Sequence, residues 1–95
     1  MMEPVALRVH LTTPGKVVVS SRRGRFEGGV LRAGNDAAAE VRATVAGETK
    51  WWAGCKARGM VQLAASGELW PDLEVRVTGC GGAELDAYYR EFPRG

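Results

Sequence analysis

The sequence predicts an α+β fold: an antiparallel four-stranded sheet with about three helices on one face, in the order β-α-β-β-α-β-α. Two observations lead to this expectation. Several short segments alternate apolar and polar residues, which is typical of half-buried strands. Between them lie segments whose apolar residues recur every three or four positions, as on one face of a helix. The 95 residues, 45% hydrophobic and 25% charged, are expected to form one domain spanning 1–95.

Four segments show the alternation of strands. The first is Val5–Leu11, where every second residue is apolar. Val41–Val45 and Thr49–Trp52 flank the turn Ala46-Gly47-Glu48, so they are expected to pair as a hairpin. Leu73–Thr78 is the fourth. Because every long strand has one polar face, we expect an antiparallel sheet covered on one side only.

Three segments show helical spacing. Ser20–Ala33 has apolar residues at that spacing, but its glycines each cost about 1 kcal/mol in a helix interior. Lys56–Ala65 places four apolar residues on one helical face. Residues 84–92 carry apolar side chains at i, i+3, i+4 and i+7 after an acidic first turn, and Pro93 ends the pattern.

Charge and cysteine content restrict the functional classes. Thirteen basic and eleven acidic residues give a net charge of +2, which offers little support for nucleic-acid binding and more for an acidic protein partner. The two cysteines form no CxxC pair, so reduced thiols in a cytoplasmic protein are expected. No apolar run approaches the roughly 20 residues that span a bilayer, and no secretory signal is recognised at the N-terminus.

Residues 74–87, Glu-Val-Arg-Val-Thr-Gly-Cys-Gly-Gly-Ala-Glu-Leu-Asp-Ala, together with the expected element order, resemble the HPr family. These proteins are small phosphocarriers of the bacterial sugar phosphotransferase system. The resemblance implies an HPr-like open-faced sandwich. It also implies an active-site histidine after the first strand, followed two residues later by arginine and then proline. Here Ser20-Ser21-Arg22-Arg23 occupies that region, and the only histidine, His10, lies inside the first expected strand.

The serines and arginines of this region could bind an anion or a partner, because arginine forks match phosphate and carboxylate geometry. The candidate site therefore consists of Ser20, Ser21, Arg22, Arg23, Arg25 and Phe26. No catalytic nucleophile with an adjacent base, no metal site and no cofactor are expected. Trp51 and Trp52 are adjacent in a strand and must point to opposite faces, so one is a candidate interface anchor.

The preferred function is a non-phosphorylated regulatory or protein-interaction domain that is not an enzyme. Its expected partner is another protein, acidic or related to the phosphotransferase system, without membrane association. One alternative is a divergent phosphocarrier that uses a noncanonical residue, His10 or a serine. The other is a small nucleic-acid-binding domain that uses the basic segment 22–32, which the near-neutral total charge disfavours. The sequence does not define the oligomeric state.

Overall fold

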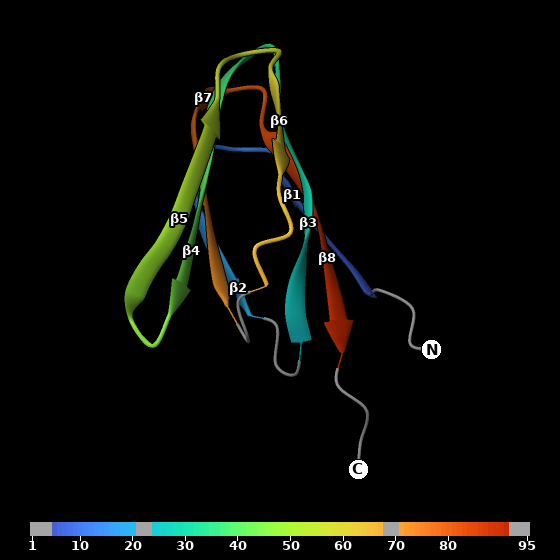
Figure 1. Ribbon diagram of the computed structural model, residues 1–95. Helices are drawn as coiled ribbons and strands as arrows, with labels where there is room; N and C mark the ends of the chain where they lie inside the picture. The colour runs from blue at the N-terminus through green and yellow to red at the C-terminus, as the bar shows by residue number, and fades with distance from the viewer. Residues whose placement is uncertain (1–4, 21–23, 68–70, 92–95) are drawn as a thin grey trace.

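The computed structural model describes residues 5–20, 24–67 and 71–91, which form an all-β sandwich of two antiparallel sheets (Figure 1). The eight strands are β1 (Val5–Leu11), β2 (Gly15–Ser20), β3 (Gly24–Ala33), β4 (Asp36–Val45), β5 (Glu48–Cys55), β6 (Met60–Leu63), β7 (Asp72–Cys80) and β8 (Ala83–Glu91). Within these described ranges there is no helix, and so none that could cross a bilayer.

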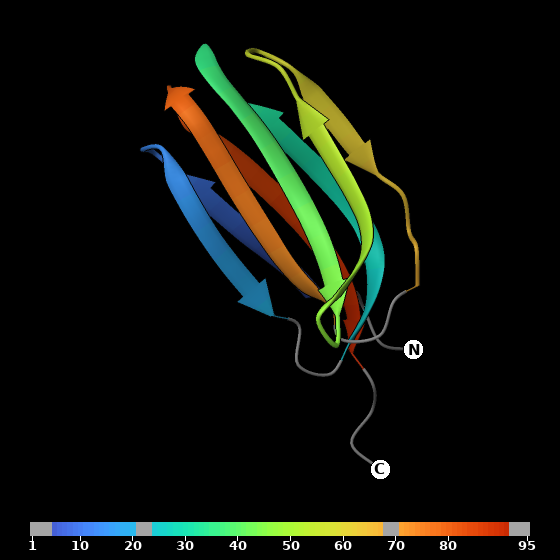
Figure 2. The same cartoon turned by 90° about the vertical axis from the view of Figure 1, so that its left-hand side faces the viewer.

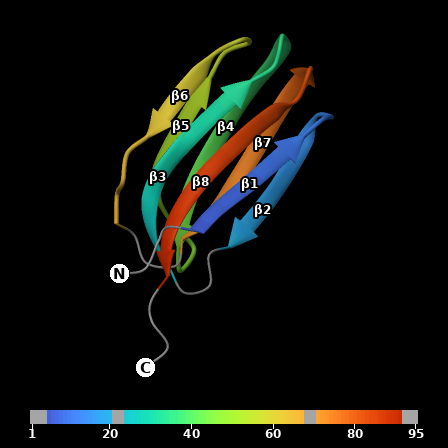
Figure 3. The ribbon, with the colours of Figure 1, turned by 90° about the vertical axis from the view of Figure 1, so that its right-hand side faces the viewer.

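The strand order follows a nested pairing. One sheet has the order β2-β7-β4-β5 and faces the viewer in Figure 2. The other has the order β1-β8-β3-β6 and faces the viewer in Figure 3. The first strand therefore pairs with the last, β2 with β7, β3 with β6 and β4 with β5, as in a long hairpin rolled onto itself. This is the topology of a jelly roll.

The core lies between the two sheets and is built by period-two alternation. In β7, Leu73, Val75 and Val77 are buried, whereas Asp72 and Arg76 between and beside them are exposed. The same alternation fills the core from β3, β4 and β8. The buried apolar residues are Phe26, Leu31, Ala37, Ala39, Val41, Ala43, Leu63, Leu73, Val75, Val77, Ala83, Leu85, Ala87 and Tyr89.

The sandwich tapers because the core side chains differ in size along it. In Figure 1 the sheets approach each other at the upper end, where β8 begins at Ala83 and β4 carries Ala37. At the opposite end, the rings of Trp51 and Tyr89 pack on Phe26, with centroids 5.2 and 5.8 Å from the Phe26 ring. Small residues permit close sheets, and large rings hold the sheets apart.

The predicted α+β fold is wrong. Ser20–Ala33 contains the last residue of β2 and all of β3, Lys56–Ala65 contains a turn and β6, and 84–92 overlaps β8. The HPr-like sandwich of one sheet with helices on one face is therefore also wrong, and the transfer of an active-site position onto Ser20–Arg23 loses the support of a shared fold. The four expected strands and the hairpin at Ala46-Gly47 are confirmed.

Two of the three wrong helices have a clear physical reason. In β8 the apolar spacing fits both periods, but the buried set is the period-two series that includes Ala83 and Ala87, while Tyr88 is 41% exposed. In β3 the glycines serve a bulge. Gly28 has φ +108°, and a Cβ on Gly29 would collide with the Asp86 carbonyl oxygen of β8. Such close approach and positive φ require glycine and leave no role for a helix.

Candidate functional site

The structure describes three of the six residues of the predicted recognition surface and places them in two different sheets. Ser20 ends β2 in one sheet, whereas Arg25 and Phe26 belong to β3 in the other sheet. Phe26 is fully buried and cannot contact a partner. This follows from the strand conformation, because neighbouring residues of a strand point to opposite faces. The remaining members of the predicted set, residues 21–23, lie outside the described residues.

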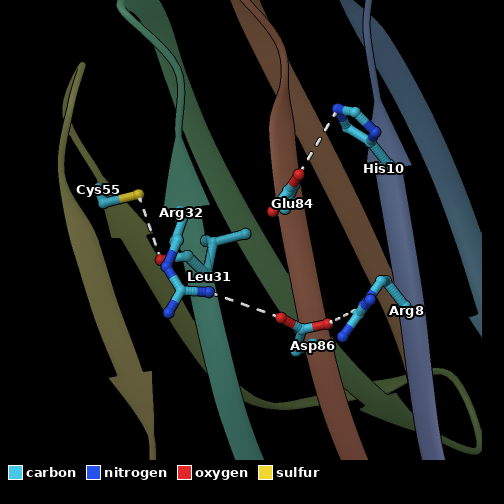
Figure 4. A network of polar contacts seen from close by, with 7 residues as sticks. All are labelled: Arg8, His10, Leu31, Arg32, Cys55, Glu84 and Asp86. Atoms are coloured by element: carbon cyan, nitrogen blue, oxygen red, sulfur yellow. Dashed lines mark hydrogen bonds and ion pairs between the residues drawn. The ribbon is translucent and has the colours of Figure 1, made fainter.

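On the outer face of the sheet β1-β8-β3-β6, basic side chains are paired with acidic residues of β8 (Figure 4). Arg8 Nε donates to Asp86 Oδ1 at 2.7 Å, and Arg32 Nη1 lies 3.5 Å from Asp86 Oδ2. His10 Nε2 is 3.8 Å from Glu84 Oε1, with 57% of its side chain exposed. Part of the basic segment 22–32 is thus neutralised by β8, which does not favour the nucleic-acid alternative.

The two cysteines differ in exposure, and the partly buried one, Cys55, is poorly suited to nucleophilic chemistry. Burial raises the pKa of the Cys55 thiol, which disfavours the reactive thiolate at neutral pH. Its Sγ lies 3.9 Å from the Leu31 carbonyl oxygen (Figure 4). Cys80 is exposed at the end of β7. In the described part of the chain, no group of three or more His, Cys, Asp and Glu side chains could hold a metal ion.

The outer face of the other sheet, β2-β7-β4-β5, carries the most developed polar arrangement. Strand register aligns Lys16, Arg76, Glu40 and Gly54 in one row across its four strands. Arg76 Nε lies 3.8 Å from Glu40 Oε1, and Arg76 Nη2 donates to Glu74 Oε1 at 3.2 Å. The Arg76 guanidinium is therefore held between two carboxylates from neighbouring strands.

Trp52 lies against this row. Its indole Nε1 donates to Glu40 Oε2 at 2.9 Å, which orients the ring. The ring lies over Gly54, because a Cβ placed on Gly54 would be 3.0 Å from Cζ2 and 3.2 Å from Cη2 of the indole. Trp52 nevertheless remains 57% exposed. A large aromatic surface is thus presented to solvent in an orientation set by a hydrogen bond and by the absence of a side chain beneath it.

A shallow groove of about 400 Å³ runs along this arrangement. Small residues, Ala38 and Thr78, leave room beside the ring, while Glu40, Arg76 and Lys56 supply hydrogen-bonding groups at the margin. We call this groove, with Trp52, Glu40, Gly54, Arg76 and Thr78, the Trp52 groove. One aromatic face with a few oriented polar groups is suited to holding a ligand.

Sequence reasoning found part of this site and missed the rest. The adjacency of Trp51 and Trp52 correctly predicted opposite faces, since Trp51 packs on Phe26 and Trp52 is exposed. Glu40 and Arg76 were missed as site residues. They are 36 positions apart in sequence and meet only through the β4–β7 pairing. The signal that could have indicated them is the alternation of charged residues on the outward positions of both strands.

Comparison with known proteins gives no further guidance, because no protein-family model, no curated protein and no solved structure matches this chain.

Proposed function

We propose that this protein is a non-catalytic binding module that holds an uncharged saccharide in the Trp52 groove. The observation that carries the proposal is the exposed indole of Trp52, which is oriented by Glu40 and seated over Gly54. The protein-interaction role expected from the sequence is thereby replaced by a ligand-binding role at a different surface.

The chemistry of a sugar ring complements this groove. A pyranose offers one face of C–H groups, which carry partial positive charge and pack favourably on the negative π-face of an indole. Its edge offers hydroxyl groups that both donate and accept hydrogen bonds. Glu40 can accept from such hydroxyls, and Arg76 can donate to them, through charge-assisted hydrogen bonds.

The charge of the groove favours an uncharged ligand. Glu40 and Arg76 form an ion pair, and Arg76 also contacts Glu74, so neither sign of charge dominates at the ring. A nucleic acid strand generally requires a basic groove with several stacking aromatics. A protein interface generally requires a cluster of apolar anchors, whereas Trp52 and Val18 are the exposed large apolar residues of this face within the described strands.

Direct binding measurements test the proposal. Isothermal titration against a panel of neutral oligosaccharides, with uronate-containing ones for comparison, should give binding to at least one neutral member. Trp52→Ala should then lower the affinity by about tenfold or more, equal to about 1.4 kcal/mol or more. The matched control is Tyr88→Ala, which removes an exposed aromatic ring from the other sheet and should leave the affinity unchanged.

Gly54→Ala refines the test without deleting the ring. The added methyl group meets the indole and must displace it, so the affinity should fall although Trp52 is still present. Binding that survives Trp52→Ala would contradict the proposal, and so would a wild-type protein that binds no member of the panel. Binding of single-stranded nucleic acid that weakens steeply with salt would favour the nucleic-acid alternative instead.

A further inference from the structure

We infer that the outer edge of β2 is an interface for a second copy of this chain, which joins it antiparallel about a two-fold axis midway between the two copies of Val18. The inference concerns a surface separate from the Trp52 groove and does not depend on saccharide binding. It rests on the contrast between β2 and the other sheet edges, and on the register that self-pairing of β2 produces.

Each sheet ends in strands with unpaired backbone hydrogen-bonding groups, which invite pairing with another chain unless they are protected. In the described structure these edge strands are β1, β6, β2 and β5. Common protective devices are a short strand, a bulge and a central charge. Three of the four edges carry one of them.

The strand β6 has only four residues, Met60–Leu63. In β5 the register breaks between Ala43 and Thr44 of its partner strand, which leaves Lys50 as an extra residue at a bulge. At the centre of β1 lies Arg8, whose side chain is 78% exposed. Antiparallel self-pairing centred on Arg8 would place two guanidinium groups opposite each other, which is unfavourable.

By contrast, β2 has no bulge, and its one charged residue, Lys16, lies near its beginning and not at its centre. Its six residues pair with β7 in an unbroken register from Gly15 to Ser20. Its centre is Val17-Val18-Val19, and Val18 is 52% exposed on the outer face. Val17 and Val19 point toward the core but are only partly buried, because no strand lies beyond β2 in this sheet (Figure 2). An apolar, unbroken edge of this kind is a site of strand addition.

Self-pairing of β2 is complementary in shape and charge. With Val18 opposite Val18 of the second copy, Val17 faces Val19 and Lys16 faces Ser20. Ser20 Oγ donates to Asp72 Oδ1 at 2.5 Å, so an acidic group of β7 lies in the same row as the incoming Lys16, one strand beyond Ser20. Lys16 is the only charged residue of β2. The two-fold axis brings the Lys16 of each copy toward an acidic group of the other copy, which favours an identical chain as the partner.

This arrangement has a consequence for the outer face. A two-fold axis perpendicular to the sheet joins the two four-stranded sheets into one of eight strands. Both copies of the Trp52 groove then open on the same face, so a repeating polymer could contact both. Two linked sites bind more tightly than one when the ligand can span them.

The test is the mass of the full chain in solution, measured by light scattering after size exclusion and by sedimentation over a range of concentrations. Wild-type protein should show the mass of two chains, each of 10.2 kDa, and dissociate to one chain on dilution. Val18→Lys should give the mass of one chain at every concentration. Met60→Lys is the matched control, because Met60 is similarly exposed on the edge strand β6 and should leave the dimer intact.

A charge-reversal pair checks the register. Lys16→Glu should weaken the dimer at least tenfold because it adds a carboxylate to the row that ends in Asp72, whereas Lys50→Glu on β5 should leave it unchanged. Amide hydrogen exchange on the wild type adds a readout that needs no variant, since outward amides of β2 should gain protection as concentration rises. A wild type that stays at one chain throughout, a two-chain mass that survives Val18→Lys, or a ladder of larger species would each overturn the inference.

Discussion

At the scale of single residues, the core contains two unfavourably buried polar atoms at the end where large rings hold the sheets apart. Trp51 Nε1 and the Tyr89 hydroxyl are buried, and neither has a hydrogen-bond partner in the described structure. A buried polar group without a partner costs about 1–3 kcal/mol. The rings themselves pack well on Phe26, so the cost falls on the polar atoms and not on the aromatic contact.

Tyr89→Phe should therefore stabilise the protein by about 1 kcal/mol, because it removes the unpartnered hydroxyl and keeps the ring against Phe26. Urea unfolding of both proteins measures the difference. Tyr88→Phe is the matched control, since Tyr88 is 41% exposed and should change the free energy of unfolding by less than about 0.5 kcal/mol. A loss of stability in Tyr89→Phe would show that the hydroxyl has a partner.

Tyr89→Phe should also change how the free energy of unfolding depends on pH. Burial, and secondarily the Asp72 carboxylate, raise the pKa of Tyr89 in the folded protein. The unfolded tyrosine ionises near its ordinary pKa of about 10, so above that pH the folded state binds more protons than the unfolded state. This contribution to stability is present below pH 10 and is lost as pH rises. Tyr89→Phe should show a shallower alkaline decline than wild type.

At the residue scale, the sequence predicted that Trp51 and Trp52 point to opposite faces, but not which side chains Trp52 contacts. The opposite faces of Trp51 and Trp52 follow from strand geometry alone. The contacts of Trp52 with Glu40, and of Glu40 with Arg76, depend on which strands are neighbours and in what register. Neither is encoded in local spacing. The misplacement of Phe26 on a surface came from the same gap, because its burial is visible only once β3 is known to be a strand.

At the scale of elements, strands whose apolar residues fit only a period of two were predictable and the others were not. Leu73–Thr78 alternates without ambiguity and lies within β7. In β8, by contrast, alanine fills buried positions beside Leu85. The apolar residues of this segment therefore fit both the helical spacing and the period of two, and the sequence predicted a helix. The glycines of β3 were recognised as unfavourable for a helix, but their use in a bulge against β8 is a tertiary property.

The hairpin between β4 and β5 offers an element-scale prediction. Ala46 and Gly47 have φ of 52° and 80°, as in the two-residue turns that require positive φ at both positions. Alanine is strained there, whereas asparagine tolerates this conformation. Ala46→Asn should raise the free energy of unfolding by about 1 kcal/mol, measured by thermal and urea unfolding.

A substitution at the same position with the opposite expected effect on stability serves as the control for the hairpin. Ala46→Val places a β-branched side chain at positive φ and should destabilise the protein. Both variants are solvent-exposed, so neither alters the core. Equal stability of the Asn and Val variants would mean that the turn does not constrain this residue.

At the scale of the whole molecule, the nested pairing makes the fold depend on both ends of the described chain. Only the β4–β5 pair is joined by a tight turn, and β1 finds its partner in β8, whose register joins Val5 to Tyr89. Contacts between residues so distant in sequence are slow to form, and we expect folding in milliseconds to seconds as for other β-sandwiches. They also make the protein cooperative, because β8 lies between β1 and β3.

Deletion of everything after Gly82 should consequently abolish folding and not merely weaken it. The deletion removes β8, which separates β1 from its only partner in the described sheet and exposes the inner face of β3 that packs beside Leu85 and Ala87. The shortened chain should show no cooperative transition by circular dichroism in urea. Addition of a synthetic peptide of residues 83–91 should restore that transition in proportion to peptide concentration. A shortened chain that still unfolds cooperatively would show that the sheet β2-β7-β4-β5 is stable alone, and the nested pairing would then not govern stability.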